Sequence, residues 1–394
     1  MIKNFKIGAV ICEFNPLHKG HKYIIDEMKR DGAVVCLMSG NFVQRGDMAI
    51  LDKWARAKMA LTCGADLVLE LPLPVATGSA KAFAFGAVKI LNSLGIVDNL
   101  YFGSESGDVN SLVKIVDILQ TKEFSAVLKE KLDEKITFAK ARELAVSEIL
   151  KQNYDNELSG SNNNLAIEYL SALKKTDSKI QPKTIKRIGA EHDSFSNDLF
   201  VSAMQIREIL KENSNSYTEK MPKEAVKILR EEIETGNAPV LFEKIETALM
   251  CKFVGMKAKD FARVADISEG LEQKIYKSIK VSSNIEELMK NVKSKRYTEA
   301  RIRRIFLHSF LGITKEMQEV SFVRILGMND TGKEILKNAK RNLPIIGKIS
   351  DTKKLSDFAK EQFETECICD DIYDLCRPIP KRKSEGYTQK IINF

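Results

Sequence analysis

The chain has 394 residues, with 62 lysines and arginines, 54 aspartates and glutamates, a net charge of +8 and 44% hydrophobic residues. This length predicts two domains, and the hydrophobic fraction excludes an intrinsically disordered protein. No apolar segment reaches the roughly 20 residues that a membrane-spanning helix needs, and the N-terminus does not have the pattern of a signal peptide. We therefore expect a cytoplasmic protein without a membrane partner.

Strands and helices alternate in the first hundred residues. Apolar segments typical of buried strands occupy residues 6–12, 32–39, 65–72 and 99–105, and helical patterns lie between them at about 20–30, 52–63 and 79–94. This alternation predicts a parallel sheet, and strands that are apolar throughout predict helices on both of its faces. The expected fold class is α/β, with a Rossmann-like domain.

Helical periodicity dominates the rest of the chain. Residues 109–150 have an amphipathic helical pattern, a polar loop leads to a helix from Leu165, and "KTIKRIGA" (183–190) is a further strand candidate. From about residue 215 to the mid-300s the pattern is nearly all helical and rich in lysine and arginine. We expect an α/β domain over residues 1–215, followed by a mostly α-helical, basic domain over residues 216–394.

The seven cysteines predict reduced thiols. Cys12, Cys36 and Cys63 lie in apolar segments, where a reduced cysteine packs as a small core residue. The spacing of Cys367 and Cys369 with Cys376 does not match a zinc pattern that includes a second cysteine or histidine pair. We therefore expect no metal site built from the cysteines.

The segment "EFNPLHKGH" (13–21) holds two of the four histidines of the chain, His18 and His21. It follows the first predicted strand and leads into the first predicted helix, and ligands bind at the carboxyl ends of parallel strands. A helix N-terminus offers free N–H groups and a positive dipole end, which suit a phosphate, and Gly20 lets the backbone approach it. The alternative interpretation is that the two histidines are a surface pair at a helix start without a role in catalysis.

The H-x-G-H pattern in this position resembles the HxGH nucleotidyltransferase superfamily. There the two histidines act as a clamp that stabilises charge on the α-phosphate while pyrophosphate leaves. The segment "SAMQIREIL" (202–210) resembles a second signature of that superfamily, in which a helix N-terminus and an arginine hold the β- and γ-phosphates. Ser202 suits the helix N-cap, Gln205 completes a capping box, and Arg207 is the candidate phosphate ligand. An ordinary capped helix with a solvated arginine is the alternative.

A wider resemblance is more specific than either motif. In order across residues 8–208, the chain resembles the bacterial tRNA(Met) cytidine acetate ligase family in "GAVICEFNPLHKGHKYII", "MSGNFVQRGDMAILDKWARAKMAL", "GADLVLELP", "YFGSE", "NNNLAIEY", "IKRIGAEHD" and "SAMQIRE". It continues in the helical half through "DISEGLEQKI", "KSKRYTEARIRRIFLHSFLGI" and "VRILGMNDTGKEIL". The resemblance implies that acetate attacks the α-phosphate of ATP to give acetyl-adenylate and pyrophosphate. The wobble cytidine of elongator tRNA(Met) then accepts the acetyl group on its exocyclic amine.

The same resemblance implies the nucleotide-binding residues. The family's main ATP-binding segment maps onto Ile11, Cys12, Glu13, Phe14, Asn15, Pro16, Leu17, His18, Lys19, Gly20, His21, Lys22, Tyr23 and Ile24. Further contacts map onto Gly103, an asparagine of the pair Asn162–Asn163, and Arg187. The family has a proline before the two asparagines, whereas this chain has Ser161-Asn162-Asn163-Asn164, so the register could shift by one residue. A Mg²⁺ ion is expected beside the triphosphate, with Glu13 and Asp47 as candidate ligands.

The segment "NFVQRGDMAILDKW" (41–54) follows the second strand, so we expect it at the same edge of the sheet as the histidines. Gln44, Arg45, Asp47 and Lys53 are candidates to line the acetate or cytidine side. Trp54 could stack on a base, but its helical spacing favours a place in the core.

A basic segment in the helical half, "KSKRYTEARIRRIF" (293–306), is the candidate tRNA-binding surface. Its cations are Lys293, Lys295, Arg296, Arg301, Arg303 and Arg304, with Tyr297 among them. Such patches attract phosphate backbones, and an aromatic ring can stack on an unpaired base, although many charge runs are only solvated helix faces. The tail "RPIPKRKSEGY" (377–387) is a weaker candidate.

Two alternative functions remain open from the sequence. A cofactor-type adenylyltransferase would share the histidine motif and pyrophosphate release, but such enzymes are usually shorter. A non-catalytic RNA-binding protein with a relict nucleotide site would not turn over ATP. A reaction that depends on acetate would distinguish the ligase from the cofactor adenylyltransferase. Any ATP turnover would exclude the non-catalytic RNA-binding protein. The sequence does not predict an oligomeric state.

Overall fold

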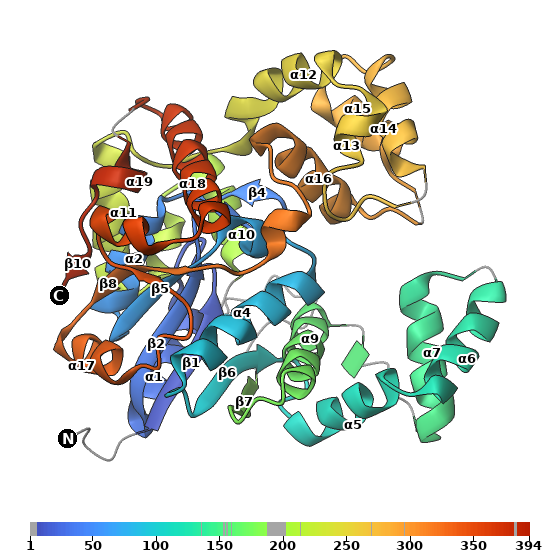
Figure 1. Cartoon of the computed structure of the whole chain (residues 1–394), viewed down its shortest axis with the longest axis horizontal. Coiled ribbons are helices and arrows are strands. Elements are labelled where there is room, and N and C mark those ends of the chain that lie inside the picture. The colour runs from blue at the N-terminus through green and yellow to red at the C-terminus, as the bar shows by residue number, and fades with distance from the viewer. Residues whose placement is uncertain are drawn as a thin grey trace.

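The computed structural model describes residues 6–134, 136–152, 154, 157–158, 160–186, 202–212, 214–268, 270–294, 296–381 and 384–394 (Figure 1). Its strands are β1 (Lys6–Cys12), β2 (Gly32–Ser39), β3 (Phe42–Val43), β4 (Asp47–Met48), β5 (Leu67–Leu71), β6 (Asn99–Ser104), β7 (Gln181–Lys186), β8 (Val323–Met328), β9 (Ile345–Ile346) and β10 (Ile392–Asn393).

The α-helices of the first half are α1 (Lys19–Asp31), α2 (Lys53–Thr62), α3 (Leu73–Ala76), α4 (Ala80–Leu94), α5 (Val109–Leu119), α6 (Lys122–Asp133), α7 (Phe138–Leu150), α9 (Ser161–Lys175) and α10 (Ala203–Lys211). Those of the second half are α11 (Lys223–Glu234), α12 (Glu246–Gly255), α13 (Ala258–Phe261), α14 (Leu271–Ile279), α15 (Ile285–Val292), α16 (Glu299–Leu311), α17 (Asp330–Asn338), α18 (Asp357–Leu375) and α19 (Glu385–Thr388). Short 3-10 turns are η1 (Ser216–Glu219), η2 (Phe242–Ile245), η3 (Glu316–Gln318) and η4 (Ile349–Lys354).

The central sheet has the strand order β10-β8-β5-β2-β1-β6-β7, and β9 pairs with β8. The five strands β5, β2, β1, β6 and β7 are parallel to one another, whereas β8 runs antiparallel to β5. From β1 the chain moves outward to β2 and β5 on one side and then to β6 and β7 on the other. The strand order therefore reverses at β1, and the carboxyl end of β1 is the place where such folds bind ligands.

Helices cover both faces of this sheet (Figure 1). Alternate side chains of β1 show why, because Ala9 and Ile11 pack with α4 and α9 while Val10 and Cys12 pack with α1 and α2. A strand buried on both faces needs apolar side chains at every position, which explains the unbroken apolar segments of the sequence. The predicted α/β fold with a Rossmann-like parallel sheet is confirmed.

The helices α12–α16 pack around a core of their own to one side of the sheet (Figure 1). In this core the ring centroid of Phe253 lies 5.5 Å from that of Phe261 and 5.4 Å from that of Phe306. The mostly α-helical character predicted for this part of the chain is therefore confirmed, and the basic tRNA-binding domain stays a prediction. The β3–β4 hairpin contributes Phe42 and Met48 to the same core, so it links the helical group to the sheet.

Strands from the second half return to the sheet, which the sequence did not predict. β8 pairs with β5, so that Leu67 lies opposite Met328, and β10 pairs with β8. The sequence pattern does not reveal β8 because helical segments precede and follow it along the chain. Its partner strand, β5, lies far away in the sequence. The boundary at residue 215 stays a prediction, but the sheet is built from residues on both sides of it.

Element boundaries differ little from the predicted ones. The helical pattern of residues 109–150 forms three helices, α5, α6 and α7. Helix α9 begins at Ser161, four residues before the predicted start, because Asn162, Asn163 and Asn164 form its first turn. Among the described residues, no helix has the length and apolar character needed to cross a bilayer.

Candidate active site

His18 and His21 form a reciprocal cap at the start of α1. His18 is the N-cap residue, and its Nδ1 accepts hydrogen bonds from the backbone N–H groups of Gly20, at 3.1 Å, and His21, at 3.4 Å. In return, the Nδ1 of His21 accepts from the backbone N–H of His18 at 3.3 Å. The two rings are stacked, with centroids 3.7 Å apart and planes inclined by 23°. The H-x-G-H pattern is therefore a capping box that fixes both imidazoles at the helix N-terminus.

This cap also determines which ring nitrogen carries the proton. A backbone N–H can only be accepted by a nitrogen with a free lone pair, so Nδ1 of each histidine is unprotonated. A neutral imidazole then carries its proton on Nε2, which is a hydrogen-bond donor. Two stacked donors beside the positive end of the α1 dipole form a favourable environment for an anion such as a phosphate.

The loop between β1 and α1 is held by contacts from distant elements. Phe14 adopts a left-handed backbone with φ of 48°, and its ring packs edge-on against His21 with centroids 5.1 Å apart. The Oδ1 of Asn15 accepts from the backbone N–H of Ile50 at 2.9 Å. The carbonyl of Asn15 accepts from Nη1 of Arg207 at 2.9 Å. The two sequence motifs are therefore brought together in space, because Arg207 lies on α10.

The start of α10 has the predicted capping box. The Oγ of Ser202 accepts from the backbone N–H of Gln205 at 3.3 Å, and the Gln205 side chain accepts from the backbone N–H of Ser202 at 2.8 Å. This part of the prediction is confirmed. Contact of Ser202 and Arg207 with a phosphate stays a prediction, and one N–H of Arg207 is already used by Asn15.

Arg56 is a residue of the site that the sequence did not single out. Its side chain is fully buried, at 0% exposure, and it donates from Nη1 to the carbonyls of Glu13 at 2.6 Å and Ser39 at 3.1 Å. Its Nη2 donates to the carbonyl of Gly40, and its Nε donates to that of Leu51 at 2.9 Å. One guanidinium thus ties together the chain just beyond β1 and β2. The signal in the sequence is a lone arginine within the buried helix "WARAKMAL".

Glu13 is the acidic residue at the carboxyl end of β1. Its Oε1 accepts from the backbone N–H of Gln44, in the β3–β4 hairpin, at 2.8 Å. Burial raises the pKa of Glu13, and the hydrogen bond from Gln44 and the nearby guanidinium groups oppose this shift. The side chain remains partly exposed at the edge of the sheet where His18 lies.

Asn162 and Asn163 hold the loop after β6 against the start of α9. The Glu105 carboxylate accepts from Nδ2 of Asn162 at 2.7 Å and from the backbone N–H of Asn163 at 2.7 Å. The side-chain Oδ1 of Asn163, which is 0% exposed, accepts from the backbone N–H of Glu105 at 2.9 Å. Burial opposes ionisation of Glu105, but these hydrogen bonds lower its pKa. The asparagines therefore fix the end of the strand that carries Gly103, and their contact with a nucleotide stays a prediction.

Two predicted residues, Arg187 and Lys295, lie outside the described residues. Of the other residues predicted to bind the nucleotide, those of the segment Ile11–Ile24 form the end of β1, the connecting loop and the start of α1. Gly103 lies near the end of the adjacent strand β6, so these residues share one edge of the sheet.

Lys53 does not line an open site, which corrects one sequence interpretation. Its side chain is 1% exposed, and its Nζ contacts Oε1 of Glu70 at 2.7 Å and Oδ2 of Asp370 at 2.7 Å. A buried ammonium needs such partners because desolvation of an unpaired charge is costly. Lys53 therefore fastens α18 to the sheet. Trp54 lies in the core, as its helical spacing predicts.

The basic segment of α16 is engaged partly within the protein. Arg301 donates to the carbonyl of Asp266 at 2.9 and 2.6 Å, and the guanidinium of Arg304 contacts the Asp266 carboxylate at 2.8 Å. Arg304 is only 9% exposed. Arg303 is more open, and it contacts Glu299 at 3.3 Å.

Two further cations of the segment lie near its start. Lys293 pairs with Glu299 at 3.0 Å, and the guanidinium of Arg296 lies 5.7 Å from the ring centre of Tyr297. The RNA-binding role of the segment stays a prediction. For Arg301 and Arg304, the geometry shows contacts inside the protein instead.

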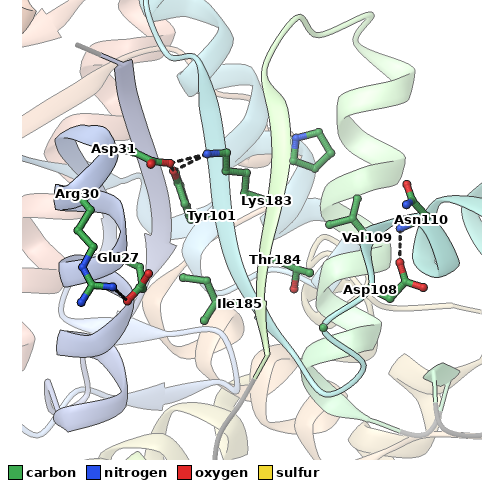
Figure 2. A pocket seen from close by; sticks show the side chains of 12 residues that line it. Glu27, Arg30, Asp31, Tyr101, Asp108, Val109, Asn110, Lys183, Thr184 and Ile185 are labelled. Carbon is green, nitrogen blue, oxygen red and sulfur yellow. Dashed lines mark hydrogen bonds and ion pairs between the residues drawn. The ribbon is translucent and has the colours of Figure 1, made fainter.

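A cavity of about 540 Å³ lies between the carboxyl-terminal part of α1 and strands β6 and β7 (Figure 2). Lys183 and Tyr101 both donate to the Asp31 carboxylate, and these hydrogen bonds lower the pKa of Asp31. The part of α1 that lines the cavity is Glu27, Arg30 and Asp31, whereas the histidines cap the other end of that helix. The polar groups of the cavity are paired with one another, so we do not place the reaction there.

The described residues contain no group of three His, Cys, Asp or Glu side chains arranged to hold a metal ion. All seven cysteines are free thiols. Burial raises the pKa of Cys367 to about 12 and that of Cys376 to about 11, which keeps both protonated and unreactive at neutral pH.

Comparisons with known proteins agree with this geometry. The chain matches the model of the HIGH Nucleotidyl Transferase family over residues 5–389. It is 45% identical over 384 residues to the tRNA(Met) cytidine acetate ligase of Thermoanaerobacter sp. (strain X514), which covers 94% of this chain and 95% of that protein. Over 415 residues it is 40% identical to the protein of the same name from Acetivibrio thermocellus, with 98% and 99% coverage. The crystal structure of Thermotoga maritima TmcAL bound with alpha-thio ATP has a TM-score of 0.89 and 32% sequence identity, and 99% of each chain is covered.

Proposed function

The chain belongs to the HIGH nucleotidyl transferase family, and from this premise we propose that it is an ATP-dependent tRNA(Met) cytidine acetate ligase. The relatives that are 45% and 40% identical over nearly its whole length carry that name. The observation that carries the proposal is the stacked pair His18–His21, which caps α1 at the point where the strand order reverses. Such a site suits an enzyme that acts on the α-phosphate of a nucleotide.

The first half-reaction is the activation of acetate. A carboxylate oxygen of acetate attacks the α-phosphorus of ATP, and the bond to pyrophosphate breaks, which leaves acetyl-adenylate. The Nε2–H groups of His18 and His21 stabilise the charge that develops on the α-phosphate, while Ser202 and Arg207 hold the β- and γ-phosphates. Catalysis then comes from positioning and electrostatics and needs no covalent enzyme intermediate.

The nucleotide lies along the segment Ile11–Ile24 in this proposal. Gly103 and the asparagines at the start of α9 border the same edge of the sheet, and Arg187 follows β7 in the sequence. A Mg²⁺ ion bound with the triphosphate would offset its negative charge, and Glu13 and Asp47 would be the candidate protein ligands.

The second half-reaction transfers the acetyl group to the wobble cytidine of elongator tRNA(Met). An unpaired base in a loop can be splayed out and presented to an enzyme, which a base in a duplex cannot. The side of the molecule that carries α16 is the candidate RNA surface, with Arg296 and Arg303 as its more open cations. We place the reaction in the cytoplasm, where ATP, acetate and tRNA are available.

Pyrophosphate release from ATP tests this function. The purified protein is assayed with and without acetate, and with an in vitro transcript of elongator tRNA(Met). Acetate-dependent release followed by acetyl label in the tRNA supports the ligase. Release that needs another nucleophile instead of acetate would favour a cofactor adenylyltransferase, and no ATP turnover would favour an RNA-binding protein.

A further inference from the structure

The β3–β4 hairpin is attached to the catalytic edge of the sheet through Gln44. The backbone N–H of Gln44 donates to Oε1 of Glu13 at 2.8 Å, and its side-chain Nε2 donates to the carbonyl of Gly78 at 3.2 Å. Glu13 directly follows β1, and Gly78 lies between α3 and α4, just beyond the end of β5. One side of the hairpin is therefore tied to the carboxyl ends of two strands.

The turn of the hairpin also packs closely against α16, so that β4 lies beside this helix (Figure 1). The backbone N–H of Gly46 donates to the carbonyl of Val43 at 2.9 Å, and Gly46 has a φ of 75°. A Cβ atom on Gly46 would lie 2.6 Å from the backbone nitrogen of Arg304 and 3.0 Å from Cβ of Arg303, so glycine is needed for this contact. The turn is thus held between the sheet and the helical group.

Arg45 is the exposed residue at the tip of this fixed turn. Within the part of the chain that the structure describes, its guanidinium has no hydrogen bond or ion pair. Burial raises the pKa of Glu13, and the charge of Arg45 is among those that oppose this shift, so Arg45 is within electrostatic reach of the end of β1. Its side chain also begins close to that of Arg303, because Gly46 is its neighbour in the chain.

We propose that Arg45 binds an RNA phosphate directly beside the target cytidine and so positions that base for acetyl transfer. The inference rests on the proposed function and deepens it by naming a contact between the catalytic edge and the RNA. Phosphate contacts fix the position of a nucleic acid on a protein, and a planar guanidinium can bind a phosphate through two N–H groups. The fixed turn means that little backbone order has to be gained on binding.

The other anions of the reaction fit Arg45 less well. In the proposed function Arg207 holds the triphosphate, and its helix α10 packs on the same face of the sheet as α1 and α2. The hairpin is tied instead to Gly78, at the start of α4, which packs on the opposite face. Acetate carries a single charge, and an exposed ion pair with one small anion contributes little. A polyanion binds well to exposed cations because each contact releases counterions.

The substitutions Arg45→Gln and Arg45→Lys test the proposal through the affinity for elongator tRNA(Met), measured at several salt concentrations. We expect Arg45→Gln to bind roughly tenfold more weakly at physiological salt. Its plot of log affinity against log salt should be less steep by about 0.7, the value for one lost phosphate contact on a single strand. Arg45→Lys keeps the charge but not the planar fork, so its slope should be unchanged and its loss of affinity smaller.

A change in the RNA tests where the contact lies. Two elongator tRNA(Met) molecules are assembled, each with one uncharged methylphosphonate, on the 5′ or the 3′ side of the wobble cytidine. One of them should bind the unaltered protein roughly tenfold more weakly, and the same RNA should show little further loss with Arg45→Gln, because the two changes remove one contact. Losses that multiply at both positions would show that Arg45 does not bind a phosphate beside the cytidine.

Arg341→Gln is the matched control, since it removes the same charge from another exposed arginine. Arg341 lies at the opposite edge of the sheet, because the backbone N–H of Lys340 donates to the carbonyl of Leu94, shortly before β6 begins. Its tRNA affinity should stay within about twofold of that of the unaltered protein.

Two results would overturn the role of Arg45. One is tRNA binding by Arg45→Gln with the affinity and salt slope of the unaltered protein. The other is a loss of ATP affinity without a loss of tRNA affinity, which would assign Arg45 to the triphosphate. Failure of the proposed function would be seen separately, as the absence of acetate-dependent pyrophosphate release by the unaltered protein.

Discussion

Arg56 offers the sharpest test of how the site is positioned, through the substitution Arg56→Met. Methionine fills much of the same space but has no donors, so the carbonyls of Glu13, Ser39, Gly40 and Leu51 each lose a hydrogen bond. At about 1 kcal/mol for each lost bond, the free energy of unfolding should fall by about 4 kcal/mol.

For a chain of this size, that loss should lower the midpoint of thermal unfolding by roughly 5–10 °C. Acetate-dependent pyrophosphate exchange at 25 °C should fall more than tenfold, because the turn after β1 is no longer tied to the end of β2. The stability and the exchange rate of Arg56→Lys should lie between those of the unaltered protein and those of Arg56→Met, because one ammonium cannot reach the carbonyls of both strands.

Arg30→Met is the control for Arg56→Met. The Arg30 side chain is 73% exposed, and within the described part of the chain its one ion pair is with Glu27, so its loss should change the unfolding free energy by less than about 0.5 kcal/mol. Differential scanning fluorimetry and pyrophosphate exchange measure both variants. An unfolding midpoint and exchange rate for Arg56→Met within error of the unaltered protein would refute the positioning role.

Three more predictions concern the catalytic turn, the buried acids and the RNA side. His18→Asn keeps a good helix-capping side chain but removes the Nε2 donor, so pyrophosphate exchange should drop about 10²–10³-fold while tRNA binding persists in a filter assay; normal exchange would contradict the clamp. Burial raises the pKa of Glu366 to about 8, so between roughly pH 4.5 and pH 8 folding binds a proton and the native state loses stability as pH rises. Glu366→Gln keeps an acceptor for the backbone N–H of Leu73 and should therefore melt at a higher temperature than the unaltered protein at pH 9 but not at pH 4.5, and an equal difference at both would contradict this. Arg303→Glu should weaken tRNA binding and reduce its salt dependence, which a titration at two salt concentrations measures, whereas replacement of the buried Arg304 should lower stability.

The sequence predicted those features that depend on local pattern. Each of these features is determined by a few neighbouring residues. They are the strands of the parallel sheet, the helix that begins after His18 and the capping box of Ser202. Trp54 was likewise placed in the core from helical spacing alone.

Side-chain partners far apart along the chain could not be predicted in this way. Lys53 looked like a site residue until its ion pair with Asp370, 317 positions later, placed it in the interior. Arg56 was overlooked because its four acceptors are carbonyls, which carry no signature in a sequence. Arg304 resembled a free cation because its partner, Asp266, lies on a separate segment.

An isotope label that follows one oxygen atom of acetate tests whether acetate attacks the α-phosphate of ATP. The protein is incubated with ATP, elongator tRNA(Met) and acetate that carries ¹⁸O in its carboxylate, and the AMP formed is analysed by mass spectrometry. If acetate attacks the α-phosphate and cytidine then attacks the acetyl carbon, each AMP must keep one heavy oxygen from acetate. AMP without the label, or release of ADP with the label in a different phosphate, would contradict activation of acetate at the His18–His21 turn.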